Sequence, residues 1–131
     1  MHITLEADYA VRIVVCLADS GIRMDAKTIS AETEVTLRFA LKILRKLVAS
    51  GIVKSFKGTQ GGYELAKEPK DISLKDVIET VDGQYHLSRC LSSEYMCSRS
   101  ESGQCRVRRI FDEISAEVEK KLEAYTFDMF K

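Results

Sequence analysis

Residues 36–67 read TLRFALKILRKLVASGIVKSFKGTQGGYELAK, a helical pattern followed by a glycine-rich hairpin pattern. Apolar residues recur at helical spacing over 37–49, and Thr36 is placed to cap that helix. Two runs typical of strands follow at 52–56 and 63–66, joined by the six residues KGTQGG. We therefore expect a helix with a two-stranded hairpin directly after it.

The flanking segments complete a familiar order of elements. Two helices are expected before this unit, over 5–19 and 26–33, and a fourth opens at a capping box that begins with Ser73. Periodicity is lost over 83–104, and a last helix is expected over about 105–126. Helix, helix, turn, helix and hairpin is the order of a winged helix-turn-helix.

These patterns divide the chain into three parts. We expect a winged helix-turn-helix DNA-binding domain over 1–82, a cysteine loop over 83–104 and a dimerisation helix over 105–131. The last helix has one narrow apolar stripe bordered by charges, which suits pairing with a second copy better than burial in a small core. The expected fold class is mainly α with a small β-hairpin.

Composition limits the compartment and the chemistry. The 131 residues include 45% hydrophobic residues and one proline, which fits one small folded domain. No run approaches the roughly 20 apolar residues of a membrane span, and charges stand where a signal peptide has its apolar run. We expect a cytoplasmic protein without membrane contact. There, reducing conditions favour metal binding or redox chemistry for the four cysteines over disulfides.

Positive charge is concentrated in residues 36–67, although the whole chain has a formal net charge of zero. Seven basic residues and one acid give this stretch a local net charge of +6. At about 100° per residue, Arg38, Lys42 and Arg45 fall on one side of the helix, opposite its apolar face. Such a helix fits the major groove of DNA, where arginine reads guanine.

The hairpin would meet phosphate or an adjacent minor groove. The alternative to DNA binding is a solvated helix face beside a tight turn. That alternative accounts for each of these residues taken alone, but not for the local positive charge combined with the order of the elements. The predicted DNA-contacting residues are Thr36, Arg38, Lys42, Arg45, Lys54, Lys57, Gly58, Thr59, Gln60 and Gly61.

Cys90, Cys97 and Cys105 lie within 16 residues at the spacing C-x6-C-x7-C. Structural zinc usually takes four ligands, often with a closer cysteine pair. Iron–sulfur clusters are held by thiolates but also normally have four ligands. An iron–sulfur cluster, a thiol redox switch and another metal all stay open on this basis. Cys16, among apolar neighbours in the first helix, is expected to be a small buried core residue.

The chain resembles, over essentially its whole length, the Rrf2 family of bacterial winged-helix regulators, which includes the iron–sulfur regulator IscR and the nitric-oxide sensor NsrR. The likeness is carried by MHITLEADYAVRIVVCLA, by the helix and hairpin that end in GGYELAK, by ISLKDVIETVDG and by the cysteine loop. It implies a homodimeric repressor on a palindromic operator of double-stranded DNA. It also implies a 2Fe–2S or 4Fe–4S cluster held by Cys90, Cys97 and Cys105, so that 83–104 is a cluster-binding loop.

The resemblance also bears on the fourth ligand. In the IscR branch a histidine three residues after the last cysteine completes the site, but this chain has Arg108 there. In the nitric-oxide-sensing branch an acid near the N-terminus of the other subunit does so, and Asp8 stands at the matching place. Asp8 is therefore the expected fourth ligand, the alternative being a solvated acid that stabilises the first helical turn.

Together these features predict a transcription regulator whose DNA affinity is controlled by an iron–sulfur cluster. The alternative is a cluster-free winged-helix regulator that acts through thiol redox chemistry or a protein partner. An enzyme is not expected, because the sequence has neither a nucleophile–base pairing nor a phosphate loop of the G-x4-G-K type.

Overall fold

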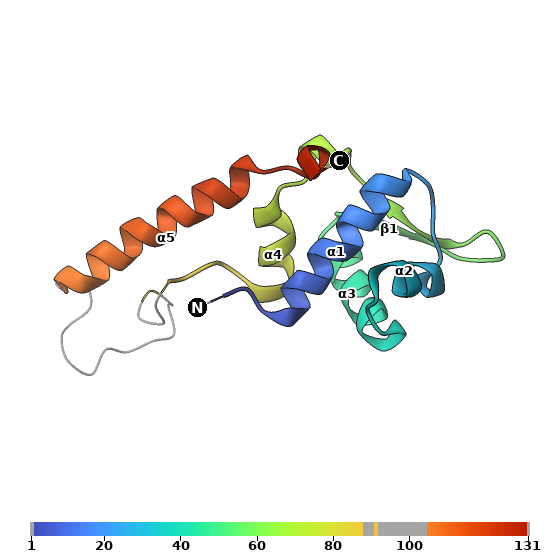
Figure 1. Ribbon diagram of the computed structural model, residues 1–131, viewed down its shortest axis with the longest axis horizontal. Helices are drawn as coiled ribbons and strands as arrows, with labels where there is room; N and C mark the ends of the chain where they lie inside the picture. Colours follow the sequence, from blue (N-terminus) through green and yellow to red (C-terminus); the bar gives the residue numbers. More distant parts are fainter. Residues whose placement is uncertain (1, 88–90, 92–104, 131) are drawn as a thin grey trace.

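The computed structural model of the chain describes residues 2–87, 91 and 105–130. These residues form a bundle of helices with a small hairpin on one side and a long helix, α5, that extends away from it (Figure 1). The helices are α1 (Leu5–Ser20), α2 (Ala26–Thr33), α3 (Leu37–Ala49), α4 (Leu74–Asp82) and α5 (Arg106–Ala124). The strands are β1 (Val53–Phe56) and β2 (Gly62–Leu65), and short 3-10 helices are η1 (Pro69–Asp71) and η3 (Phe127–Phe130). The predicted fold class, mainly α with a small hairpin, is confirmed.

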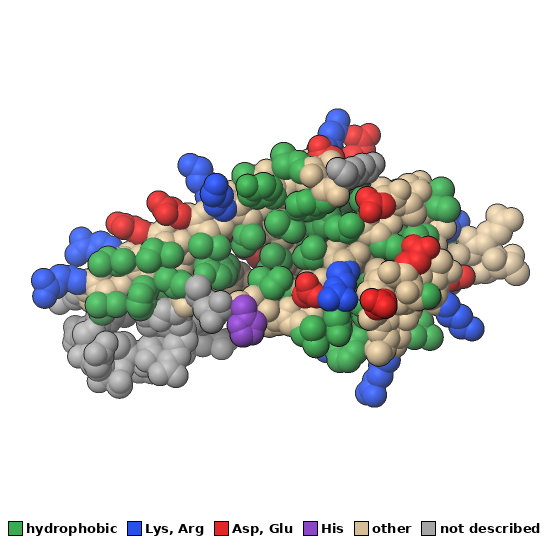
Figure 2. Space-filling view, in the orientation of Figure 1, with side chains coloured by type: hydrophobic (Ala, Val, Ile, Leu, Met, Phe, Trp, Pro, Cys, Tyr) green, Lys and Arg blue, Asp and Glu red, His purple; other side chains and the backbone are tan. Residues whose placement is uncertain are grey.

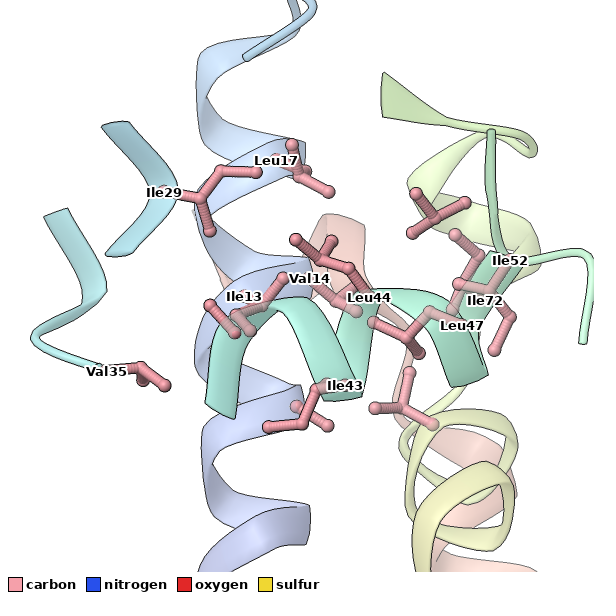
Figure 3. Packing of buried hydrophobic residues seen from close by; sticks show 14 of the residues in the cluster. Ile13, Val14, Leu17, Ile29, Val35, Ile43, Leu44, Leu47, Ile52 and Ile72 are labelled. Atoms are coloured by element: carbon pink, nitrogen blue, oxygen red, sulfur yellow. The ribbon is translucent and has the colours of Figure 1, made fainter. Parts of the chain in front are cut away.

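One apolar core holds α1, α2, α3, the hairpin and α4 together. Figure 3 shows side chains from these elements pointing toward one another, with α3 in the middle. The apolar face predicted for α3 is completely buried: Ala40, Ile43, Leu44 and Leu47 are each 0% exposed. Burying each of the larger three is worth about 1.5–3 kcal/mol, so the rotation of α3 about its axis is strongly determined.

Local capping explains where the helices begin and end. The Thr36 hydroxyl accepts a hydrogen bond from the Phe39 amide, as the prediction required. Ser73 and Asp76 form the predicted capping box at the start of α4. Glu34 ends α2 in the left-handed region, with φ of 57°, and thereby turns the chain into α3.

Compared with the prediction, β1 begins one residue later, and β2 begins and ends one residue earlier. The two strands pair antiparallel, with Val53 opposite Leu65. Ile52 is not a strand residue, because its amide donates to the Leu47 carbonyl and closes the end of α3. Tyr63 also pairs with Met24 of the α1–α2 connection, through N–H to carbonyl bonds of 2.7 and 2.9 Å.

The last helix is shorter than predicted because the chain after it returns to the core. The Leu74 amide donates to the Tyr125 carbonyl and the Phe127 amide to the Ile72 carbonyl. Phe127 is 1% exposed, so it belongs to the core of the helix bundle. The division of the chain near 82 and 104 stays a prediction.

The apolar stripe of α5 lies at the surface. Val107, Ile110 and Ile114 are exposed by 48%, 55% and 39%. Figure 2 shows hydrophobic side chains in a row along this helix. In the part of the chain that is described, no helix is both long and apolar enough to cross a membrane.

Candidate nucleic-acid interface and cysteine site

The outer face of α3 carries the predicted basic row. Arg38, Lys42 and Arg45 are exposed on the side opposite the buried face of the helix. Because the core holds that opposite face, the row has a defined direction. The predicted DNA-contacting residues that are exposed are Thr36, Arg38, Lys42, Arg45, Lys54, Lys57, Gly58, Thr59 and Gln60, whereas Gly61 is partly buried.

An acid of α1 reaches the edge of this row. The Glu6 carboxylate lies 3.0 Å from Lys46 Nζ and 3.5 Å from Lys42 Nζ. The hydrogen bond from Lys46 is the main reason why the pKa of Glu6 is lowered. DNA phosphate approaching Lys42 would compete with Glu6 for the ammonium group. Sequence reasoning missed this contact, because nothing local links residues 40 positions apart.

The hairpin tip is built to a tight geometry. Lys54 and Lys57 are exposed, and the Gly61 amide donates to the Gly58 carbonyl over 3.0 Å. A Cβ atom at Gly61 would lie 2.4 Å from the Phe56 carbonyl oxygen, which no side chain tolerates without a backbone shift. Glycine at position 61 is therefore required by the turn itself, while Gly58, Thr59 and Gln60 are exposed.

Arg23, outside the stretch singled out by sequence, clamps this tip. Its guanidinium donates to the Gln60 carbonyl over 3.1 Å and lies 3.4 Å from the Glu64 carboxylate. The same group lies 3.3 Å from the centroid of the Phe56 ring. The only acid between 36 and 67 is thus paired, and the tip is held against the α1–α2 connection.

The predicted cluster ligands are only partly within the described residues. Cys90 and Cys97 lie outside them. Cys105 is partly buried and occupies the N-cap position of α5. Asp8 lies in the first turn of α1, about half exposed, and forms an ion pair of 3.1 Å with Arg12.

The first turn of α1 and the start of α5 are well separated in Figure 1. One chain therefore does not bring Asp8 and Cys105 together. Within the described ranges, no three histidine, cysteine or acidic side chains are grouped so that they could hold a metal ion.

Cys16 lies at the rim of the core rather than inside it, which corrects the prediction. Its thiol is 3.4 Å from Glu32 Oε2 and 3.9 Å from Met24 Sδ. Burial, with the neighbouring Glu32 carboxylate, raises the pKa of Cys16 to about 11. This thiol is therefore protonated near neutral pH and is a poor nucleophile.

Comparison with known proteins agrees with this geometry. The model of the Rrf2 family, described as iron-dependent transcriptional regulators, matches residues 3–130. An rrf2-like HTH-type transcriptional regulator of Rhodobacter capsulatus is 33% identical over 120 residues, covering 86% of this chain and 80% of the relative. The HTH-type regulator NsrR of Shouchella clausii is 26% identical, covering 96% of this chain and 85% of its own.

Solved structures show the same fold. IscR of T. potens has a TM-score of 0.76 at 22% identity, covering 98% of this chain and 84% of its own. The cysteine regulator CymR of B. subtilis has a TM-score of 0.78 at 22% identity, covering 98% and 94%. The relatives are regulators, so the prediction that the chain is not an enzyme is confirmed. The chain belongs to the Rrf2 family of winged-helix transcriptional regulators.

Proposed function

We propose that the chain is a homodimeric repressor that binds a palindromic operator through α3 and the hairpin, and that an iron–sulfur cluster sets its DNA affinity. The observation that carries the proposal is the exposed cationic row of α3, held in one direction by a completely buried opposite face. The regulator acts in the cytoplasm, on the DNA there.

In the DNA complex α3 lies in the major groove. Its N-terminal end, with Thr36 and Arg38, approaches base edges, while Lys42 and Arg45 meet phosphates. The hairpin tip adds Lys54, Lys57 and the amides of Gly58, Thr59 and Gln60, with Gly61 holding the turn because its own amide is bonded to the Gly58 carbonyl. Two copies related by a two-fold axis would read half-sites about one helical turn apart, or a multiple of it.

The exposed stripe of α5 supports the dimer. Val107, Ile110 and Ile114 are spaced three and four residues apart and so form one contiguous face. A contiguous apolar face on a surface helix usually marks an interaction site. Antiparallel or crossed pairing with the same helix of a second copy buries it on both chains at once.

The available donor set fits an iron–sulfur cluster. Thiolates are the ligands such clusters take, and Cys105 sits at a helix N-terminus, where the amides and the helix dipole favour a thiolate. Cys90, Cys97 and Cys105 would hold the cluster, with Asp8 of the second subunit as the fourth ligand. When bound, the cluster supplies a centre that reacts with nitric oxide or oxidants.

Coupling to DNA follows from the contacts of α1. Asp8 shares the first turn of α1 with Glu6, which is bonded to Lys46 of α3. When the cluster of the other subunit binds or releases Asp8, the first turn of α1 should therefore shift, and with it the contact between Glu6 and Lys46 that holds α3. A change of this kind alters the population of dimers competent to bind.

A cluster-free regulator is the second candidate. It is favoured by the likeness to CymR, one of whose solved structures, from Staphylococcus aureus, is of an oxidized form. Thiol chemistry would then reside in Cys90, Cys97 and Cys105, since Cys16 stays protonated.

The deciding experiment is anaerobic purification with iron and sulfide analysis and a visible spectrum, beside a Cys97→Ala control. We expect coloured protein that contains both elements, and a Cys97→Ala protein that loses them. DNA affinity is then compared for loaded and emptied dimers. Colourless wild-type protein would favour the thiol candidate, and equal affinity of the two forms would remove the proposed control.

The DNA contacts have their own test. Arg38→Ala should lower discrimination between operator and mutated operator by about 1–3 kcal/mol, if it reads a base with two hydrogen bonds. Lys57→Ala should weaken all sequences alike and reduce the slope of log affinity against log salt by roughly 0.9, because one phosphate contact is lost. Fluorescence anisotropy at several salt concentrations measures both. Full discrimination by Arg38→Ala would remove the base-reading role.

A further inference from the structure

The outer face of α3 includes one apolar side chain among its cations. Leu41 is 38% exposed, and Arg38 stands three residues before it and Arg45 four residues after it. Residues at these spacings are neighbours on a helix surface, so Leu41 lies between the two arginines. A single exposed leucine is ordinary on a protein surface, and it is the position of this one within the cationic row that is informative.

Leu41 forms the edge of the row that faces away from α1. At about 100° per residue, it lies about 60° from Arg38 and about 100° from Lys42 around the helix axis. Lys42 and Lys46 form the opposite edge, where both approach the carboxylate of Glu6 in α1. A groove of DNA that receives Arg38 therefore also receives Leu41.

The major groove offers a leucine side chain one apolar group to contact. Every base pair presents hydrogen-bonding groups there, and thymine adds a methyl group at C5. Leucine cannot bond to the amino group of cytosine or to the acceptors of guanine, so covering them would cost their hydrogen bonds to water. Residues 37–49 also include no acid that could accept a hydrogen bond from cytosine.

We infer that Leu41 reads the C5-methyl group of a thymine in each operator half-site. The inference rests on the proposed binding of DNA through α3, and it adds a second base to the one that Arg38 reads. Three residues of helix span about 4.5 Å, and successive base pairs are about 3.4 Å apart. The thymine therefore lies within about two base pairs of the base contacted by Arg38.

Uracil in place of thymine removes the methyl group and keeps every hydrogen-bonding group. An operator is first selected from random-sequence duplexes with the full-length protein, purified anaerobically, and each thymine of it is then exchanged for uracil in turn. We expect one position in each half-site at which uracil weakens binding about fourfold, the effect of losing one buried methyl group. Exchange in both half-sites should weaken binding about 15-fold. Fluorescence anisotropy measures the affinities.

Two leucine variants locate the effect on the helix. Leu41→Ala should bind thymine and uracil duplexes equally, and it should fold, because the position is exposed and alanine is the better helix former. Leu37→Ala is the matched control. Leu37 is also 38% exposed, but it lies about 100° from Arg38, at the side of the helix, so this variant should keep the fourfold difference. Discrimination kept by Leu41→Ala, or lost in Leu37→Ala, would overturn the inference.

Methylated cytosine gives a second measurement, because its methyl group is also at C5. With a C·G pair at the thymine position, methylation of that cytosine should strengthen binding of the wild-type chain about fourfold and leave Leu41→Ala unchanged. The possible failures are distinguishable. A protein that selects no DNA would contradict the proposed function itself, whereas a selected operator on which uracil costs nothing would overturn only the role of Leu41.

Discussion

Removing Arg23 should loosen the hairpin without unfolding the helix bundle. In the wild-type chain its guanidinium bonds to the Gln60 carbonyl, pairs with Glu64 and stacks on Phe56. A two-stranded hairpin is marginal by itself, so these contacts carry much of its local stability. Arg23→Ala removes all three.

The magnitude follows from the exposure of the groups involved. The ion pair is over one-third exposed at both ends, which limits it to about 0.2–1 kcal/mol. The hydrogen bond to the carbonyl contributes about 0.5–1.5 kcal/mol, and an exposed cation–π contact about 0.5–1 kcal/mol. Since contacts of one side chain are not additive, we expect a loss of about 1–2 kcal/mol.

Hydrogen exchange measures this loss where it occurs. A loss of 1–2 kcal/mol is a factor of roughly 5–30 in an opening equilibrium. Amides of 53–65 should therefore exchange about 5–30-fold faster, while those of α1 keep their rates. Affinity for DNA should fall alike for all sequences, because the contacts proposed for the hairpin are to the DNA backbone rather than to base edges.

Two variants sharpen the experiment. Arg23→Lys keeps the charge but loses the planar group that stacks and donates in two directions, so it should behave more like alanine than like arginine. Lys27→Ala removes an exposed positive charge from the nearby helix α2 and should leave exchange over 53–65 unchanged. Wild-type exchange rates in Arg23→Ala would refute the clamp.

Three further predictions concern stability in urea unfolding. Ser73→Ala should lower the free energy of unfolding by about 0.5–2 kcal/mol, because the capping box loses its hydroxyl. Gly62→Ala should be more costly than an ordinary helix-surface change, since its Cβ would lie 2.6 Å from the Met24 carbonyl oxygen at a φ of 145°. Glu6→Gln should destabilise near neutral pH only. The pKa of Glu6 is lowered in the folded chain, mainly by its hydrogen bond with Lys46. The stability that this bond contributes is therefore complete above the ordinary pKa of 4.5 and is lost as the pH falls through the lowered value.

Each of these has a control and a contrary outcome. Ser55→Ala, at an exposed serine of β1, should change stability little, and a cost equal to that of Ser73→Ala would argue against the cap. Gly83 also has a positive φ, of 77°, but open space around it, so Gly83→Ala isolates backbone strain from steric clash. A Glu6→Gln deficit that persisted unchanged in acid would contradict the ion-pair explanation.

Local interactions made much of this protein readable from its sequence. The 3.6-residue period marked α2 and α3 residue for residue, and Thr36 and Ser73 identified helix starts, because a cap acts within three residues of itself. The basic row of α3 was predictable for the same reason, since residues at helical spacing share a face wherever the helix packs. The end of the last helix could not be predicted in this way, because the hydrogen bonds that draw Phe127 into the core come from a distant segment.

The sequence by itself determined the elements, their order and the charge on the outer face of α3. Only the tertiary structure decided that Glu6 shields Lys46, that Arg23 clamps the hairpin, and that Cys16 meets Met24 at the rim of the core. Each of these contacts joins side chains from separate elements. Their distance depends on how whole helices pack against one another, which no local spacing of residues encodes.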